Sequence, residues 1–417
     1  MPDMSPAAGS ALPVGARDPR LDFFRGLSLL MIYINHVPGT VYENLTSRNF
    51  GLSDAAEGFV FMSGCAAALA YGPKMKHGLN WASVRRGWGR SWTLYLTHMF
   101  TTIWAIAIVS GAALWFGSSV MLEQQGYQVM GSDPLAFMIG IATLGHQLGY
   151  VNILPMYAVL MLGAPFLIRL GQRSPIGLLA ASVGFWAFTG MTHFDLPNFP
   201  QEGGWFFNPF AWQMIFSFGI LTGLALRHGH RFAPLKGWLI WVAAIWVVIC
   251  LVWVKSETIK TGIGEYVRHL RDLGVPFFLV EFDKTYVSLP RFAHFIALAY
   301  LLSLPWGVPR FAASKAMAPV RLLGRHGLQV FAASTVLAIF GQAVKQVHPA
   351  GFGQDSVLIL GGLALLWAFA WIRDRIRQSD KAIAATQHAR HAAPHAPRAA
   401  GAAATTEGKP HYAAAAR

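Results

Sequence analysis

Residues 237–254 read GWLIWVAAIWVVICLVWV, an apolar run without a charged side chain. A helix of this length and composition is long enough to cross the hydrocarbon core of a bilayer. Comparable stretches recur along the chain, and we expect membrane helices at 21–38, 52–71, 91–116, 151–170, 175–190, 209–226, 237–254, 290–306, 327–344 and 356–373. The sequence therefore predicts an all-α polytopic membrane protein with about ten transmembrane helices.

The composition of the 417-residue chain agrees with this fold class. Hydrophobic residues make up 54% and charged residues only 12%, whereas soluble proteins carry roughly twice that charged fraction. This excludes a disordered chain, a collagen-like fibre and an ordinary cytosolic enzyme. The two cysteines, Cys65 and Cys250, both lie in apolar runs, which disfavours a disulfide framework or a cysteine metal site.

The positive charges predict the orientation in the membrane. The net charge is +14, and Lys and Arg concentrate in 72–90, 227–236 and 307–325. Such loops face the cytoplasm in membrane proteins, so the basic balance indicates topology rather than nucleic-acid binding. The apolar segment 134–146 is too short for a full crossing and is expected to be a half-helix or a buried segment. Ten crossings with both termini cytoplasmic place every basic loop inside.

Three parts of the chain are distinguished by composition. Residues 1–20 are polar and form a predicted cytoplasmic N-terminal segment, and residues 21–373 form the predicted transmembrane domain. Residues 374–417 are rich in Ala, His, Pro and Arg without apolar periodicity. This composition predicts a disordered, basic cytoplasmic tail.

The first predicted helix carries ionisable residues, which mark function by default inside a membrane. Arg25 and His36 are eleven positions apart, which places both on one helix face, about 16 Å from each other along the axis. Asp22 lies one turn before Arg25 and can pair with it. His36 is expected in the outer half of the membrane, either as a reactive imidazole or as a polar group packed between helices.

The second predicted helix begins with two carboxylates, Asp54 and Glu57. A short outer loop joins it to the first helix, so both are expected at the depth of His36. A carboxylate beside an imidazole forms a general-base arrangement. The alternative is that Asp54 caps the helix and Glu57 is its reciprocal partner in the first turn.

Two further clusters have both a structural and a functional interpretation. Arg85, Arg86 and Arg90 precede the third predicted helix and either contact lipid head groups or bind a phosphate-bearing donor. The outer loop 191–208 combines aromatic residues with acids and amides. It suits stacking on sugar rings, although an interfacial aromatic belt explains its Trp-Phe-Phe run slightly better.

Three stretches resemble a known family. They are DPRLDFFRGL at 18–27, NFGLSDAAEGFVF at 49–61 and LGRHGLQVF at 323–331. The chain resembles the OpgC family of the transmembrane acyltransferase superfamily from about residue 17 to residue 377. It departs from the family pattern at Cys65, where an aromatic residue often stands, and at Gly327, where a small hydroxyl residue is more usual.

The resemblance implies an acyl-CoA-dependent O-succinyltransferase of the bacterial inner membrane that modifies hydroxyls of periplasmic glucan. Family roles carry over to Arg25 and His36, and in the same motifs to Asp54, Glu57 and Arg325. The CoA phosphates are expected at Arg85, Arg86 and Arg90, together with Arg25 and Arg325. Acyl-CoA is then a donor substrate, and neither a permanently bound cofactor nor a metal is expected.

Other functions remain open at this point. The enzyme could transfer acetyl groups to another envelope polysaccharide. A transporter would use the intramembrane charges as a substrate or ion pathway, and a scaffold would recruit glucan-synthesis proteins. The lipid bilayer and the glucan acceptor are the expected partners of the enzyme, with glucan-synthesis proteins as further candidates.

Overall fold

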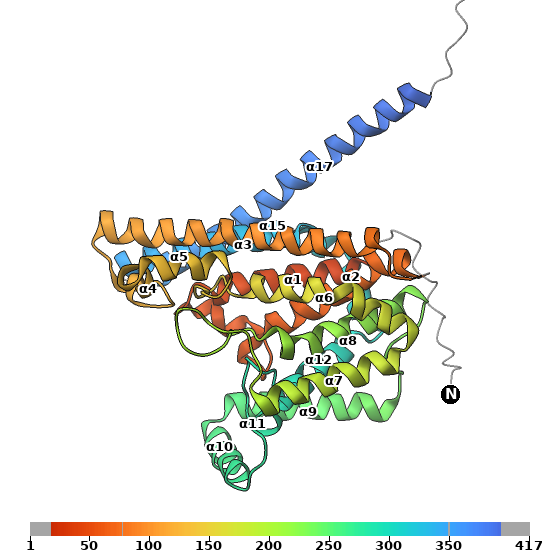
Figure 1. The fold of residues 1–417 in the computed structure, drawn as a ribbon, viewed down its shortest axis with the longest axis horizontal. Helices are drawn as coiled ribbons and strands as arrows, with labels where there is room; N and C mark the ends of the chain where they lie inside the picture. Colours follow the sequence, from red (N-terminus) through yellow and green to blue (C-terminus); the bar gives the residue numbers. More distant parts are fainter. Residues whose placement is uncertain (1–17, 77, 349–350, 393–417) are drawn as a thin grey trace, which may run out of the picture. The chain divides into compact units, whose positions relative to one another are not determined.

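The computed structural model describes residues 18–76, 78–348 and 351–392. Over these ranges it is helical and contains no β-strand, and Pro197 and Gly204 form an isolated β-bridge (Figure 1). The helices that correspond to the predicted crossings are α1 (Pro19–Asn35), α2 (Ala55–Tyr71), α3 (Trp81–Phe116), α6 (Ile153–Arg173), α7 (Pro175–Thr192), α8 (Pro209–Arg227), α9 (Gly237–Lys255), α12 (Leu289–Leu302), α15 (Gly327–Val347) and α17 (Gly362–Ala392). The protein is an all-α polytopic membrane protein.

Eight helical segments of the described chain are long and apolar enough to cross a membrane. The two remaining predicted crossings, α1 and α12, are helices of 17 and 14 residues. Shorter helices connect the long ones: α4 (Gln128–Ser132), α5 (Pro134–Ala142), α10 (Glu257–Asp272), α11 (Phe277–Val280), α13 (Val308–Ala313), α14 (Ala318–Arg325) and α16 (Phe352–Ser356). α5 has nine residues and a length of about 14 Å, in agreement with a half-helix.

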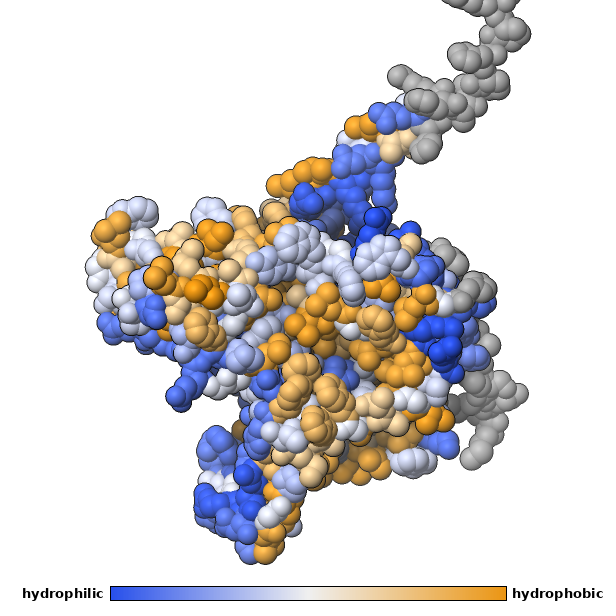
Figure 2. Space-filling model, viewed as in Figure 1, coloured by the Kyte–Doolittle hydropathy of each residue, from blue (hydrophilic) through white to orange (hydrophobic). Residues whose placement is uncertain are grey.

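The outer surface of the helices fits a lipid environment. α9 exposes a row of large apolar side chains, among them Trp241, Ile245 and Val248. Figure 2 shows apolar residues spread over the helices on the visible face and hydrophilic residues gathered around α10. Because such apolar surface is unfavourable in water, these helix faces are suited to contact lipid.

Close helix contacts at glycine hold the interior together. A Cβ atom at Gly64 of α2 would clash with the carbonyl oxygen of Phe216 on α8, and one at Gly219 would clash with that of Phe61. A Cβ atom at Gly324 of α14 would likewise clash with the carbonyl oxygen of Asp22 on α1. Small residues let helix backbones approach closely in a membrane, and this contact places the following residue, Arg325, beside α1.

The third helix begins earlier than predicted. It starts at Trp81 rather than at residue 91, and the Asn80 side chain caps it by accepting a hydrogen bond from the Ser83 amide at 2.9 Å. Arg85, Arg86 and Arg90 are therefore residues of the helix and do not precede it. The apolar run begins near residue 91, but the helix begins before it because Arg and Trp are compatible with helical backbone.

The last helix extends beyond the predicted end of the membrane domain. The first compact unit of the chain ends at Ile372, and the described part of the second unit, from Arg373 to Ala392, is helical. Residues 374–392 thus differ from the predicted disorder, because Ala, Arg, Gln and Lys favour helix even without an apolar stripe. The rest of the predicted tail, 393–417, and most of the predicted N-terminal segment, 1–17, lie outside the described residues.

Candidate functional site

A cavity of about 300 Å³ brings together arginines from three helices. Arg25 of α1, Arg90 of α3 and Arg325 of α14 line it, and we call it the arginine cavity. Arg25 Nη2 donates a hydrogen bond to the Met62 carbonyl oxygen at 3.3 Å. Three guanidinium groups around one cavity make a site for an anion, because each presents planar donors that match phosphate or carboxylate.

The other predicted arginines do not join this site. Arg85 and Arg86 are exposed on α3 and do not line the arginine cavity. This placement favours the lipid head-group interpretation for this pair.

Asp22, which was expected to pair with Arg25, forms an ion pair with Arg325, with 3.9 Å between Oδ2 and Nε.

Gly327, one of the departures from the family pattern, has a packing role. A Cβ atom at this first residue of α15 would lie 2.7 Å from Cδ of Arg25. The absence of a side chain therefore leaves room for the Arg25 side chain at the edge of the cavity. Even a serine at this position would require Arg25 to shift.

The arginine cavity is elongated along α2. Its α2 residues recur on one helix face, at Phe59, Ser63, Ala66, Ala67, Ala70 and Tyr71. From Phe59 to Tyr71 the helix rises about 18 Å. The short side chains of Ala66, Ala67 and Ala70 leave space beside α2 for a slender chain whose anionic end lies at the arginines.

The carboxylates of α2 have partners other than the predicted imidazole. Asp54 caps the helix by accepting from the Ala56 amide at 2.8 Å, and Glu57 Oε2 accepts from the Asp54 amide at 2.9 Å. Both carboxylates also pair with Arg291 of α12, and Asp54 pairs with Lys284 as well. No hydrogen bond joins either carboxylate to His36 in the described part of the chain. The contacts described for Asp54 and Glu57 are those of the capping interpretation, and they include no hydrogen bond to the imidazole.

The physical reason is burial. The Glu57 side chain has no exposed surface, and a buried carboxylate needs a counter-charge that remains charged. A guanidinium supplies that charge and several donors at once, which a neutral imidazole does not. No sequence signal pointed to either partner, because Arg291 lies in an apolar helix far along the chain and Lys284 lies in a loop without a motif.

His36 lies at the C-terminal end of α1. Its carbonyl oxygen accepts a hydrogen bond from Gln342 Nε2 of α15 at 2.6 Å, and its ring packs edge-on against Tyr150, with 4.7 Å between ring centroids. Its buried Nδ1 has no hydrogen-bond partner among the described residues. Buried polar atoms are normally paired, so this imidazole is available to a bound molecule.

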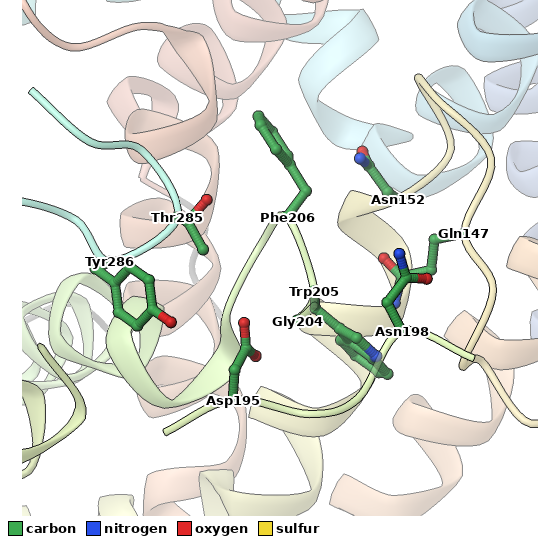
Figure 3. A pocket seen from close by; sticks show the side chains of 9 residues that line it. All are labelled: Gln147, Asn152, Asp195, Asn198, Gly204, Trp205, Phe206, Thr285 and Tyr286. Atoms are coloured by element: carbon green, nitrogen blue, oxygen red, sulfur yellow. The ribbon is translucent and has the colours of Figure 1, made fainter. Parts of the chain in front are cut away.

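A second cavity, of about 360 Å³, lies among the loops that follow α5 and α7 and precede α12. We call it the loop cavity (Figure 3). Its lining is made of amide, carboxyl, hydroxyl and aromatic side chains, together with one glycine: Gln147, Asn152, Asp195, Asn198, Gly204, Trp205, Phe206, Thr285 and Tyr286. Trp205 is 6% exposed and Phe207 is buried as well, so the belt interpretation, which needs surface aromatic residues, holds only for Phe206.

Asp195 is the acidic residue among the described residues that line the loop cavity. Burial raises the pKa of its carboxyl group to about 7, although the nearby backbone amides of Leu196 and Trp205 act in the opposite direction. Tyr286 lines the same cavity, and burial together with the charges of Asp195 and Asp283 raises its pKa. Asp195 therefore titrates near neutral pH.

This shift predicts a pH dependence of stability. Between the ordinary pKa of 3.8 and the folded value of about 7, the folded protein holds a proton that the unfolded chain has released. The contribution of Asp195 to the free energy of unfolding is therefore greatest below the lower pKa and falls as the pH rises towards the upper pKa. As the pH rises from about 4 to about 7, Asp195→Asn is expected to lose less thermal stability than the wild type, measured in detergent. Glu202→Gln, which changes an exposed acid of the same loop, is the control, and an equal slope in all three proteins would contradict the assignment.

The comparisons with known proteins identify one family. A family model described as OpgC protein matches residues 17–378. No curated protein and no solved structure matches the chain. The match includes both cavities, His36 and the Asp54–Glu57–Arg291 cluster.

Proposed function

Because the chain belongs to the OpgC protein family, and is thus a membrane acyltransferase that acts on periplasmic glucan, we propose that it takes the acyl group from acyl-CoA. Succinyl is the group we expect. We further propose that the enzyme lies in the bacterial inner membrane, with both termini in the cytoplasm. The donor then enters from the cytoplasm and the acceptor from the periplasm.

The observation that carries the donor assignment is the convergence of Arg25, Arg90 and Arg325 on one elongated cavity. Acyl-CoA has an anionic end with phosphates, a slender pantetheine arm and a thioester at its far end. The guanidinium groups suit the phosphates, and the α2 face from Tyr71 to Phe59 suits the arm over about 18 Å. Arg25 lies about 16 Å before His36 along α1, so an extended arm can carry the thioester towards the imidazole.

In the transfer step, His36 acts as the general base. It removes the proton of a glucan hydroxyl while the hydroxyl oxygen bonds to the thioester carbonyl carbon. The carbon–sulfur bond then breaks, and the CoA sulfur receives the proton from the imidazolium. An acyl-histidine intermediate would be the covalent alternative. Asp54 and Glu57 contact Arg291 rather than the imidazole, so we assign them as positioning residues.

The arginines provide the test of donor binding. Arg90→Ala and Arg325→Ala are each expected to raise the KM for acyl-CoA by about tenfold or more, because a hydrogen bond to a charged group contributes about 1.5–3 kcal/mol. The KM for glucan should change little. The matched control is the double variant Arg85→Ala, Arg86→Ala, which removes two exposed arginines of the same helix.

Steady-state kinetics with purified protein in detergent measure these values, and mass spectrometry of the product glucan identifies the added acyl group. If the Arg85/Arg86 variant raised the KM for acyl-CoA as much as Arg90→Ala, the donor would not be bound in the arginine cavity. An added mass equal to that of an acetyl group would replace succinyl in the proposal.

A further inference from the structure

The loop cavity has a lining that suits a neutral sugar. Its polar side chains are amides, hydroxyls and a single carboxyl group, and no Lys, Arg or His is among the described residues that line it. Sugar hydroxyls both donate and accept hydrogen bonds, and side-chain amides can also act as donors and acceptors. An anionic ligand would instead need the cationic donors found in the arginine cavity.

Two residues that line this cavity each have a polar atom without a partner among the described residues. Asp195 Oδ2 and Gln147 Oε1 are buried and have no hydrogen bond within the described chain. In Figure 3 the Asp195 carboxyl group points between Tyr286 and Trp205 into the space that the labelled side chains surround. Leaving buried acceptors unpaired costs free energy, and hydroxyl donors from a ligand would remove that cost.

The loop backbone is shaped around this carboxyl group. The Leu196 amide donates to Asp195 Oδ1 at 2.7 Å, which fixes one oxygen of the carboxyl group. Asn198 and Gly203 pair through their backbones at 3.0 Å, so the loop turns back on itself. A Cβ atom at Gly204 would clash with Asp195 Oδ2, so the glycine is required for the carboxyl group to stay where it is.

Two residues that line the cavity are linked to the neighbourhood of Asp54 and His36. Phe206, which lines it, has Lys284 Nζ 6.0 Å from its ring centroid, and Lys284 pairs with Asp54. On the other side, Asn152 lies two residues after Tyr150, the residue that packs against the His36 ring. Two residues that line the loop cavity are therefore each one step removed from a residue that contacts Asp54 or His36.

We propose that the loop cavity binds a neutral glucose unit of the acceptor glucan, with the Asp195 carboxyl group accepting hydrogen bonds from its hydroxyls and Phe206 stacking on its ring. This site assignment rests on the proposed function for the identity of the sugar. Phe206 is half-exposed and provides the ring face. Aromatic faces are common platforms for apolar ring surfaces, and Trp205 is a second aromatic residue that lines the cavity.

The test measures binding and turnover separately. The probe is unsubstituted periplasmic glucan prepared from cells that lack this transferase, titrated calorimetrically into the full-length protein in detergent. Asp195→Asn and Phe206→Ala are each expected to raise the Kd for glucan about tenfold, and to raise the KM for glucan while leaving the KM for acyl-CoA unchanged. Phe188→Ala is the matched control, because Phe188 is as exposed as Phe206, at 50%, and lies outside the cavity.

Each outcome separates the two proposals. If the wild type bound glucan but the Asp195 and Phe206 variants bound it equally well, the acceptor would occupy another site and this inference would be overturned. If glucan binding depended on both residues but no acyl group were transferred, the cavity assignment would stand and the proposed function would fall. A stronger response to an anionic oligosaccharide than to neutral glucan would overturn the neutral-sugar assignment.

Discussion

His36→Ala is expected to abolish the transfer of acyl groups to glucan while the protein remains folded in the membrane. A positioned general base contributes about 10²- to 10⁴-fold to a rate, so the loss should reach the detection limit in cells. The fold should survive because the interaction that fastens the end of α1 is between the His36 backbone carbonyl and Gln342. That hydrogen bond does not depend on the imidazole.

The measurement is the acyl content of periplasmic glucan by mass spectrometry, alongside the amount of protein in the membrane fraction. His228→Ala is the control, because His228 is an exposed histidine at the end of α8 and should leave the acyl content unchanged. Glucan that is fully substituted in the His36→Ala strain would eliminate the imidazole from the mechanism. If His36→Ala were lost from the membrane, the same measurement would be made with His36→Gln, which keeps a polar side chain of similar length.

Arg291→Leu is expected to have the largest effect on stability. The guanidinium pairs with Glu57, whose side chain is fully buried, and with Asp54 at 3.3 Å. Removing one partner of a buried ion pair leaves an uncompensated charge and costs about 3–5 kcal/mol. Thermal unfolding in detergent should therefore show a strongly lowered midpoint, or the variant should fail to accumulate.

An exposed ion pair provides the control for this prediction. Arg271 and Glu281 lie 2.8 Å apart, but both side chains are 40% exposed, so Arg271→Leu should cost no more than about 1 kcal/mol. The double variant Arg291→Leu, Glu57→Leu removes the unpaired charge and should recover part of the lost stability. Equal losses in the Arg291 and Arg271 variants would show that burial does not govern this cluster.

The transmembrane helices could be predicted from the sequence because their signal is local. Each apolar run had a matching helix in the structure, and the runs at 237–254 and 327–344 were placed within a few residues. The predicted helix ends were less accurate where the composition changes within one helix, as at the start of α3. A helix can continue into water, where no apolar stripe marks it in the sequence. The continuation of α17 to Ala392 was missed for the same reason.

The candidate site was predictable only in part. The Arg25–His36 spacing lies within one helix, where a separation in sequence is also a separation in space. The partners of Asp54 and Glu57 were not predictable in that way, because Arg291 is more than two hundred residues away in the chain and no local pattern couples the two. The loop cavity combines three segments that only the packing of α5, α6, α7 and α12 brings to one place.

The sequence by itself determined that the chain is a bundle of membrane helices, with a cation and an imidazole held about 16 Å apart on one helix face. Hydrophobic length and helical periodicity are properties of neighbouring residues, so no tertiary information is required for them. The tertiary structure decided which arginines meet, which charges neutralise the buried carboxylates and which loops enclose a cavity. Those choices depend on where helices approach closely, as at Gly64 and Gly324, and on the cost of leaving a buried charge without a partner.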